Sequence, residues 1–297
     1  MVKGGTGRPR SPWIGFLIFT GLWIAAFSFV LIRLIRFSLG SELESYIPLI
    51  PIISVYLLHL KRGGASALPV ISDSGRVGAV LFWVASAGLL LAQVVLVSGG
   101  WIEGKGYLLF LPVTAFITGV IGGVAFFFGL PAFRSSLFPL LILYFMVPIP
   151  ELVAHALRVG LQQGSADAAA ALFWLTGTPV LREGLNFCLP GLTIQVAEEC
   201  SGIHSTLVLL IVSLVAGHLF LKKTWSRTLL ALLVIPLGLV RNGIRVVALA
   251  LLTVHVNAGI IDGPLHHRGG PVFFALSFGV LAAVLWGLRR HERRKGV

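Results

Sequence analysis

Long apolar segments with few charged residues constrain this chain more than any other feature. One of them runs from Trp13 to about Leu34, and similar segments recur to the C-terminal end. A helix needs about 20 consecutive apolar residues to cross the hydrocarbon of a bilayer. Only 11% of the residues are charged and the mean hydropathy is +0.95, whereas about a quarter of the residues in a soluble domain are charged. The pattern predicts an all-α polytopic membrane protein.

The apolar segments predict about eight transmembrane helices, and one region between them differs. Residues 150–200 are too polar for a plain span, and we expect an interfacial helix followed by a short hairpin there. We expect three parts in the chain: a basic tail at 1–12, a single transmembrane domain at 13–288 with its core motifs in 143–274, and a basic tail at 289–297. The expected spans are 13–34, 46–60, 77–98, 107–129, 134–149, 202–221, 228–253 and 271–288.

The net charge of +12 is explained by membrane orientation. Lysine and arginine gather in short loops and tails, and such loops are cytoplasmic in most membrane proteins. Eight spans then place both termini in the cytoplasm and residues 150–200 outside, although Arg33 and Arg36 fall on the unexpected side. Because the basic residues follow the spans, we expect no nucleic-acid partner.

Three polar clusters are predicted to meet at the outer face. They are VAEECSGIHS at 196–205, RNGIR at 241–245 and DGPLHHRGG at 262–270. An arginine within a hydrophobic span is costly unless it faces a polar partner or cavity, and it therefore marks a candidate functional site. The clusters supply a thiol, guanidinium groups and imidazoles. A cation lowers the pKa of a thiol, an imidazole transfers protons, and an arginine stabilises an oxyanion, so the set suits acyl transfer through a thioester.

The same motifs resemble the exosortase/archaeosortase family. The resemblance covers about residues 40 to 288 and rests on FMVPIPELV, VAEECSGIHS, RNGIRV and HHRGGPVFF. It implies that Cys200 is the nucleophile, that Arg245 stabilises the oxyanion and that His266 is the acid/base, with His267 as the second choice. The residues expected to support them are Asn242, Ser201, Gly202, Arg241 and Glu199.

The resemblance also implies a function. Such a protein would be a cysteine transpeptidase or protease of the prokaryotic cell (inner) membrane, acting at its outer face. Its substrates would be exported proteins with a C-terminal sorting signal of the PEP-CTERM type, which consists of a short motif, a transmembrane helix and a basic tail. Besides membrane lipids, an envelope glycolipid or polysaccharide could act as the acceptor. We expect no cofactor and no metal, because adjacent histidines without further ligand spacing make a poor metal site.

Other interpretations stay open at this point. A transporter could line an anion path with Arg241, Arg245 and the histidines, and a non-catalytic envelope assembly protein would need none of these residues. Arg241 could instead extend to the lipid headgroups. His204, one turn after Cys200, is a weaker candidate for the base. Cys188 has no motif, and we interpret it as a packing residue or a loop thiol.

Overall fold

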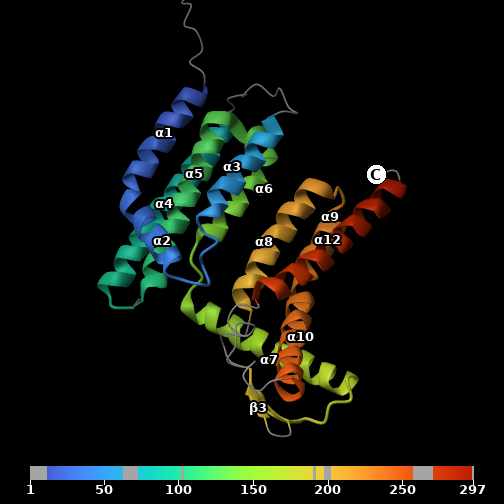
Figure 1. Ribbon diagram of the computed structural model, residues 1–297. Helices are drawn as coiled ribbons and strands as arrows, with labels where there is room; N and C mark the ends of the chain where they lie inside the picture. The colour runs from blue at the N-terminus through green and yellow to red at the C-terminus, as the bar shows by residue number, and fades with distance from the viewer. Residues whose placement is uncertain are drawn as a thin grey trace, which may run out of the picture. The chain divides into compact units, whose positions relative to one another are not determined.

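The computed structural model describes residues 12–62, 73–101, 104–189, 192–196, 202–256 and 270–295 (Figure 1). The chain forms two compact units, Met1–Glu151 and Leu152–Val297. Apart from one small sheet, the described elements are helices, so the protein is an all-α polytopic membrane protein as the sequence predicts. The single domain expected at 13–288 remains a prediction.

The first unit is built around one long buried helix, α5. Helices α1, α2 and α4 pack against it, and α6 with η1 packs against α3. The elements are α1 (Pro12–Ala26), α2 (Ser28–Leu39), α3 (Leu49–Arg62), α4 (Asp73–Ser98), α5 (Lys105–Ser135), α6 (Leu137–Ile142) and the 3-10 helix η1 (Leu143–Met146).

Tryptophan side chains of α1 and α4 pack against glycines of α5 and donate hydrogen bonds to its backbone carbonyls. The Trp23 Nε1 donates to the carbonyl of Phe116 at 3.0 Å, and the Trp83 Nε1 donates to that of Gly119 at 3.2 Å. Gly119 has no side chain, which leaves room for the Trp23 ring. Small residues allow helices to approach closely in a membrane, where the backbone must find its hydrogen-bond partners within the protein.

The second unit combines helices with an antiparallel sheet of order β1-β2-β3. The sequence predicts a hairpin here, and the structure contains β2 and β3 paired with Asn186 opposite Gln195, together with β1 as a third strand. The elements are α7 (Glu151–Leu175), β1 (Leu181–Glu183), β2 (Asn186–Leu189), β3 (Leu192–Gln195), α8 (Ile203–Phe220), α9 (Thr224–Leu232), α10 (Val234–His255) and α12 (Gly270–Arg294).

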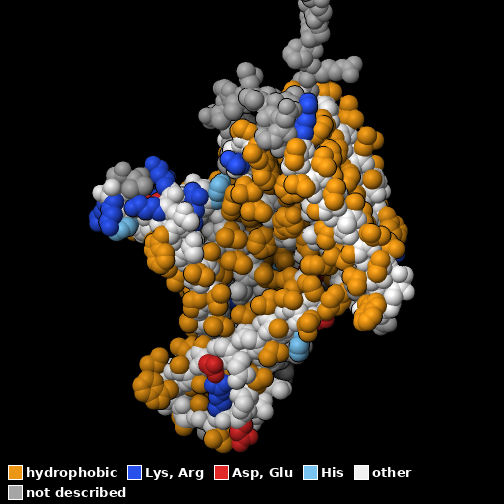
Figure 2. Space-filling model, turned by 180° about the vertical axis from the view of Figure 1, so that it is seen from behind, with side chains coloured by type: hydrophobic (Ala, Val, Ile, Leu, Met, Phe, Trp, Pro, Cys, Tyr) orange, Lys and Arg blue, Asp and Glu red, His pale blue; other side chains and the backbone are white. Residues whose placement is uncertain are grey.

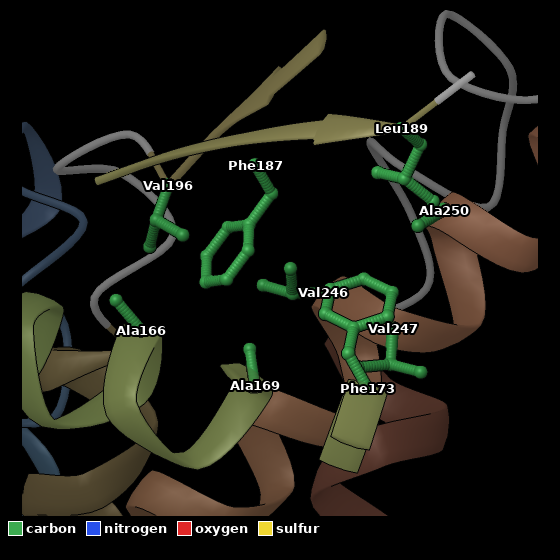
Figure 3. Close-up of a cluster of buried hydrophobic side chains, with 9 residues drawn as sticks. All are labelled: Ala166, Ala169, Phe173, Phe187, Leu189, Val196, Val246, Val247 and Ala250. Atoms are coloured by element: carbon green, nitrogen blue, oxygen red, sulfur yellow. The ribbon is translucent and has the colours of Figure 1, made fainter. Parts of the chain in front are cut away.

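Two apolar clusters hold the second unit together. In the first, shown in Figure 3, side chains of α7, the sheet and α10 surround Phe173 and Phe187, whose ring centroids lie 5.5 Å apart. The second joins α8, α9, α10 and α12 around Leu209, Leu230 and Leu281. Thus the C-terminal half of α10 belongs to the first cluster and its beginning to the second.

The described helices account for fewer independent spans than the sequence predicts. Five are long and apolar enough to cross a membrane alone, or up to seven if two bent pairs each count as one span. The predicted span 13–34 is one such pair, α1 and α2, bent by 68°. The predicted span 46–60 becomes α3, whose 14 residues reach only about 21 Å at 1.5 Å per residue, short of a hydrocarbon core of about 30 Å.

The surface suits a lipid environment. On the face shown in Figure 2, apolar side chains cover most of the helices. Large apolar residues such as Leu17, Leu81 and Leu91 are each at least 65% exposed. Monomeric soluble proteins rarely expose apolar patches of more than a few hundred Å². The exposed side chains of these helices therefore face lipid.

Candidate active site

The described part of the predicted site lies where α8 begins beside α10. Gly202 precedes α8, and Arg241, Asn242 and Arg245 lie on α10. The other predicted site residues lie outside the described residues: Glu199, Cys200, Ser201, His266 and His267.

Helices α8 and α10 touch along a surface that we call the α8–α10 seam, formed by Gly202, Thr206, Gly238 and Arg241. Gly202 has a φ of +66°, a left-handed conformation that favours glycine. A Cβ on Gly202 would lie 2.5 Å from the Arg241 Nη2. One turn away, a Cβ on Gly238 would lie 2.8 Å from the Thr206 Oγ1. The two glycines therefore let polar groups of the facing helix come close.

Arg241 is buried in the protein. Only 4% of the residue is exposed, and its Nη2 donates to the Gly202 carbonyl at 3.4 Å. The Arg241 Nη1 is buried and has no hydrogen-bond partner within the described part of the chain. Of the two interpretations open from the sequence, the structure therefore disfavours extension to the headgroups. Arg245 follows one turn later and is half-buried, so two guanidinium groups share this part of α10.

Residues of α7 that lie outside the predicted motifs position both sides of the site. The Asn242 Nδ2 donates to the Oγ of fully buried Ser165 at 3.2 Å. The Gln162 Nε2 donates to the carbonyl of Val196 at 2.6 Å. Gln162 and Ser165 are three positions apart and therefore share a helix face. Two uncharged polar residues at this spacing, within an alanine-rich helix, are the signal that could have revealed them.

These contacts fix both ends of the segment that contains the cysteine motif. At one end, the N–H of Val196 donates to the carbonyl of Leu185 at 3.0 Å, and the Val196 carbonyl accepts from Gln162. At the other end, Gly202 lies against Arg241 and Asn242. Residues 197–201 therefore connect two fixed points, one at the end of the sheet and one beside α10.

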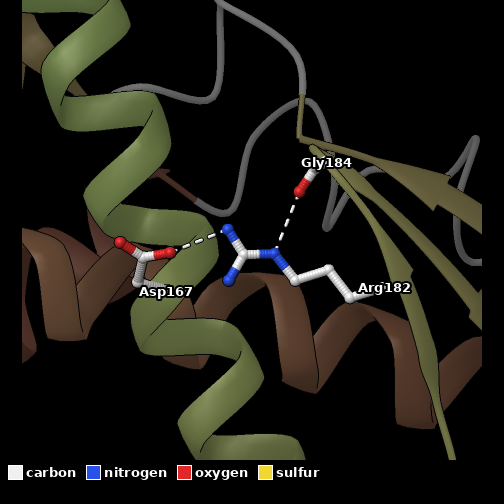
Figure 4. A network of polar contacts seen from close by, with 3 residues as sticks. All are labelled: Asp167, Arg182 and Gly184. Atoms are coloured by element: carbon white, nitrogen blue, oxygen red, sulfur yellow. Dashed lines mark hydrogen bonds and ion pairs between the residues drawn. The ribbon is translucent and has the colours of Figure 1, made fainter.

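An ion pair holds the sheet on α7, as Figure 4 shows. The Arg182 Nη2 lies 2.7 Å from the Asp167 Oδ1, and the Arg182 Nε donates to the Gly184 carbonyl at 2.9 Å. The guanidinium carbon also lies 5.8 Å from the centre of the Phe187 ring. Because Asp167 is largely exposed, the pair contributes about 1 kcal/mol or less. Its main effect is to orient β1 on the helix that carries Ser165.

Basic residues gather at the opposite end of the second unit. The buried carboxylate of Glu292 accepts the backbone N–H groups of Lys222 at 2.8 Å and Lys223 at 3.1 Å. The turn between α8 and α9 is therefore tied to the C-terminal end of α12, where Arg289, Arg290, Arg293 and Arg294 lie. The 18 residues of α8 span about 27 Å. Gly202 thus lies about one hydrocarbon thickness from the basic end.

Among the described residues, no group of three or more histidine, cysteine, aspartate or glutamate side chains could hold a metal ion. The polar groups that the structure brings together near Gly202 are an amide, hydroxyls and two guanidinium groups, which suit hydrogen bonding to an anionic group.

Comparison with known proteins identifies the family of the chain. The family model described as transmembrane exosortase matches residues 38–283, which is most of the chain and includes all four quoted motifs. Comparisons with curated proteins and with solved structures find no significant match. Exosortases are membrane proteins that process or sort proteins with C-terminal signals. The chain belongs to the transmembrane exosortase family.

Proposed function

We propose that this exosortase is a cysteine transpeptidase or protease that uses Cys200, Arg245 and His266 at the outer face of the prokaryotic inner membrane. The observation that supports this proposal most strongly is the close contact of Gly202 with α10. Cys200 precedes Gly202 by two residues, and two residues of extended chain reach about 7 Å. Covalent geometry therefore limits the Cα of Cys200 to about 7 Å from that of Gly202, which supports a thiol near the part of α10 that carries Arg241 and Arg245.

The lengths of α8 and α12 also favour a position of His266 at the same depth as Cys200. The Glu292 contacts join the end of α8 to the end of α12. Gly202 lies about 20 residues before that junction along α8, and Gly270 lies about as many residues before it along α12. Each helix therefore spans roughly 30 Å between its glycine and the junction. His266 comes four residues before Gly270, and His267 comes three before it. The starts of both helices therefore lie at similar depth, opposite the basic end.

The charge distribution supports an extracytoplasmic site. Short basic loops and tails stay in the cytoplasm. The end that carries Lys222, Lys223 and the arginines of α12 would then be cytoplasmic. The opposite end, with Gly202, the sheet and the α8–α10 seam, would face the outside, where exported substrates are found.

The reaction follows from the three groups. The thiolate of Cys200 attacks a peptide carbonyl near the outer end of the substrate's C-terminal span, and the Arg245 guanidinium stabilises the resulting oxyanion. The C–N bond breaks, the imidazolium of His266 protonates the departing amine, and an acyl thioester remains. A hydroxyl of an envelope glycolipid or polysaccharide, or water, then attacks the thioester and releases the thiol. Asn242 and Gly202 fix the local backbone, and Ser201 and Glu199 flank the thiol in sequence.

Substrates in this proposal are exported proteins with a short motif, a transmembrane helix and a basic tail, as in signals of the PEP-CTERM type. Such a helix can lie beside the exposed apolar helices of the enzyme within the same bilayer. Its motif would then be presented at the depth of the α8–α10 seam.

Replacing the thiol tests the nucleophile. We expect Cys200→Ala to lower substrate processing at least about 1,000-fold, because a missing nucleophile removes the covalent route. Cys188→Ala is the matched control, since Cys188 is a half-buried thiol on β2 and should tolerate the change. The measurement is the size of a tagged substrate in membranes that contain equal amounts of each variant. Normal processing by Cys200→Ala would refute the proposal.

Replacing the cation tests the oxyanion role separately. We expect Arg245→Gln to lower kcat about 100- to 1,000-fold while substrate binding changes much less, because one donor to a developing negative charge contributes that much. The measurement is the rate of thioester formation at saturating substrate. A change confined to KM would instead assign Arg245 to substrate binding.

A further inference from the structure

We propose that the α8–α10 seam is a subsite that binds a carboxylate of the protein substrate through the Arg241 Nη1 and the Thr206 Oγ1. The inference rests on the proposed function, and it assigns to Arg241 and Thr206 a role in recognising the substrate, separate from the chemistry at Cys200.

Arg241 is a buried cation with unused hydrogen-bonding capacity. Its residue is 96% buried, yet its guanidinium makes a single long hydrogen bond, to Gly202, and its Nη1 has none among the described residues. A second cation, Arg245, lies one turn away. Burying a charge without a counter-charge is unfavourable. The arrangement is explained if an anion completes it.

Thr206 supplies a second unused polar atom on the facing helix. Threonines within helices commonly bond a carbonyl one turn back, as Thr253 does to Leu249 at 2.8 Å and Thr114 does to Phe110 at 2.7 Å. The buried Thr206 Oγ1 has no such partner within the described chain and lies beside Gly238. A threonine hydroxyl in this state can donate to an anionic oxygen.

The two polar side chains lie in successive turns of the seam, one on each helix. Thr206 lies one turn after Gly202 on α8, and Gly238 lies one turn before Arg241 on α10. In both turns a glycine faces the polar group, and a Cβ would come within 2.8 Å of it. The glycines therefore keep side-chain atoms away from the Arg241 Nη2 and the Thr206 Oγ1.

A carboxylate of the substrate fits this seam better than a lipid phosphate does. A carboxylate is planar and matches the guanidinium fork, and a hydroxyl can donate to one of its oxygens. The Arg241 side chain is buried between the helices, and a side-chain carboxylate is smaller than a phosphate on a glycerol backbone. The seam also adjoins Gly202, the fixed end of the segment that carries the proposed nucleophile.

The stability of the free protein separates this role from a structural one. We expect Arg241→Gln to raise the Tm of the full chain in detergent, because it removes a buried charge that has no carboxylate partner among the described residues. A structural arginine would behave in the opposite way. Arg182→Gln is the matched control, since it removes an arginine that has a carboxylate partner, and its Tm should stay equal or fall. Addition of sodium acetate, compared with sodium chloride at equal ionic strength, should raise the Tm of the wild type by about 2 to 4 °C and leave that of Arg241→Gln unchanged.

Recognition of the substrate is tested with two reporters, one with its natural aspartates and glutamates ahead of the C-terminal span and one with the corresponding amides. Wild-type enzyme should process the acidic reporter with at least about 10-fold lower KM. Arg241→Gln and Thr206→Val should raise KM for the acidic reporter and lose the discrimination, with kcat changed much less. A discrimination that persists in Arg241→Gln would overturn the inference.

The test remains informative if the proposed function fails. Binding of the two reporters can be measured on Cys200→Ala, which needs no turnover. If Cys200→Ala still processes substrate, the thioester mechanism is wrong, but preference for the acidic reporter still supports the subsite. A rise in Tm with anionic phospholipid and none with acetate would assign the seam to a lipid phosphate and overturn the inference.

Discussion

Glu44 shows how strongly a single polar residue can depend on its surroundings in this protein. It lies between α2 and α3 and is 97% buried. Its Oε1 accepts the N–H of Ile149 at 2.9 Å, and its Oε2 has no hydrogen-bond partner among the described residues. Burial raises the pKa of Glu44, the Ile149 N–H opposes this effect, and the charge of Glu151 raises the pKa further. The carboxylate form is therefore unfavourable in the folded first unit.

This leads to a pH-dependent prediction. Because the pKa of Glu44 is higher in the folded than in the unfolded state, the folded state binds the proton more tightly. The contribution of protonated Glu44 to stability is full below the pKa of the unfolded state and is lost as the pH rises through the pKa of the folded state. Glu44→Gln keeps an acceptor for Ile149 and removes the charge, so it should raise the Tm at pH 8 and have little effect at pH 4.5. Thermal unfolding at the two pH values measures this.

The control for Glu44 is Glu42→Gln, which changes an exposed acid two residues away. It should leave the pH dependence of the Tm unaltered. An equal gain from Glu44→Gln at both pH values would show that the charge is not the cause.

The sequence alone identifies some of the buried polar residues of this protein and not others. Arg241, Asn242 and Arg245 could be predicted, because polar residues within an apolar segment are visible without a structure. Glu44, Gln162 and Ser165 could not be identified as buried and hydrogen-bonded. Their burial depends on which distant backbone group or side chain meets them, and local sequence does not contain that information.

At the scale of elements, the crossing of α7 and α10 sets the position of Asn242. Gly243 follows Asn242, and a Cβ on it would lie 3.0 Å from the backbone of Ala168 and Ala169. Since backbone atoms cannot yield easily, we expect Gly243→Ala to lower the free energy of unfolding by about 1 to 3 kcal/mol. It should also lower activity by displacing Arg241 and Asn242. Chemical unfolding and substrate processing measure the two effects.

Gly160→Ala is the matched control for this crossing. Gly160 lies within α7 and would find nothing within 4 Å of an added Cβ. Because alanine is the better helix former, this change should stabilise by about 0.5 to 1 kcal/mol. Equal effects of the two substitutions would mean that the close approach at Gly243 is unimportant.

The elements themselves were predictable from apolar periodicity and length, but their interruptions were not. The break between α1 and α2 falls at Phe27, with no proline or glycine beside it. The ring of Phe27 packs against Trp23 at 5.0 Å and Phe116 at 5.5 Å between centroids. Phe116 lies on α5, so a contact that is distant in sequence accompanies this bend. The sequence of residues 13–34 alone does not reveal that contact. The third strand, β1, was not predicted, because an alternation of apolar and polar residues cannot be recognised over only three residues.

At the scale of the second unit, the separation of charge and chemistry along the helices predicts an orientation. The basic residues of α12 and of the α8–α9 turn lie at one end, and Gly202, which follows the sheet in the chain, lies about 27 Å away at the other. Positive loops favour the cytoplasm. Thr193→Cys on β3 should therefore react with a membrane-impermeant thiol reagent in intact spheroplasts, and Lys295→Cys should react only after permeabilisation. Both positions are exposed, so access to the reagent depends on the side of the membrane.

The labelling needs a background without native thiols, which the chain offers because it contains only two cysteines, Cys188 and Cys200. Cys188→Ala with Cys200→Ala removes both, and permeabilised cells give the full labelling of each position. If Lys295→Cys reacts in intact spheroplasts while Thr193→Cys is protected, the unit is inverted. The α8–α10 seam would then face the cytoplasm, where an exported substrate could meet it only before translocation. That order of events is incompatible with processing at the outer face, so the same two substitutions test both the membrane orientation and the site of the reaction.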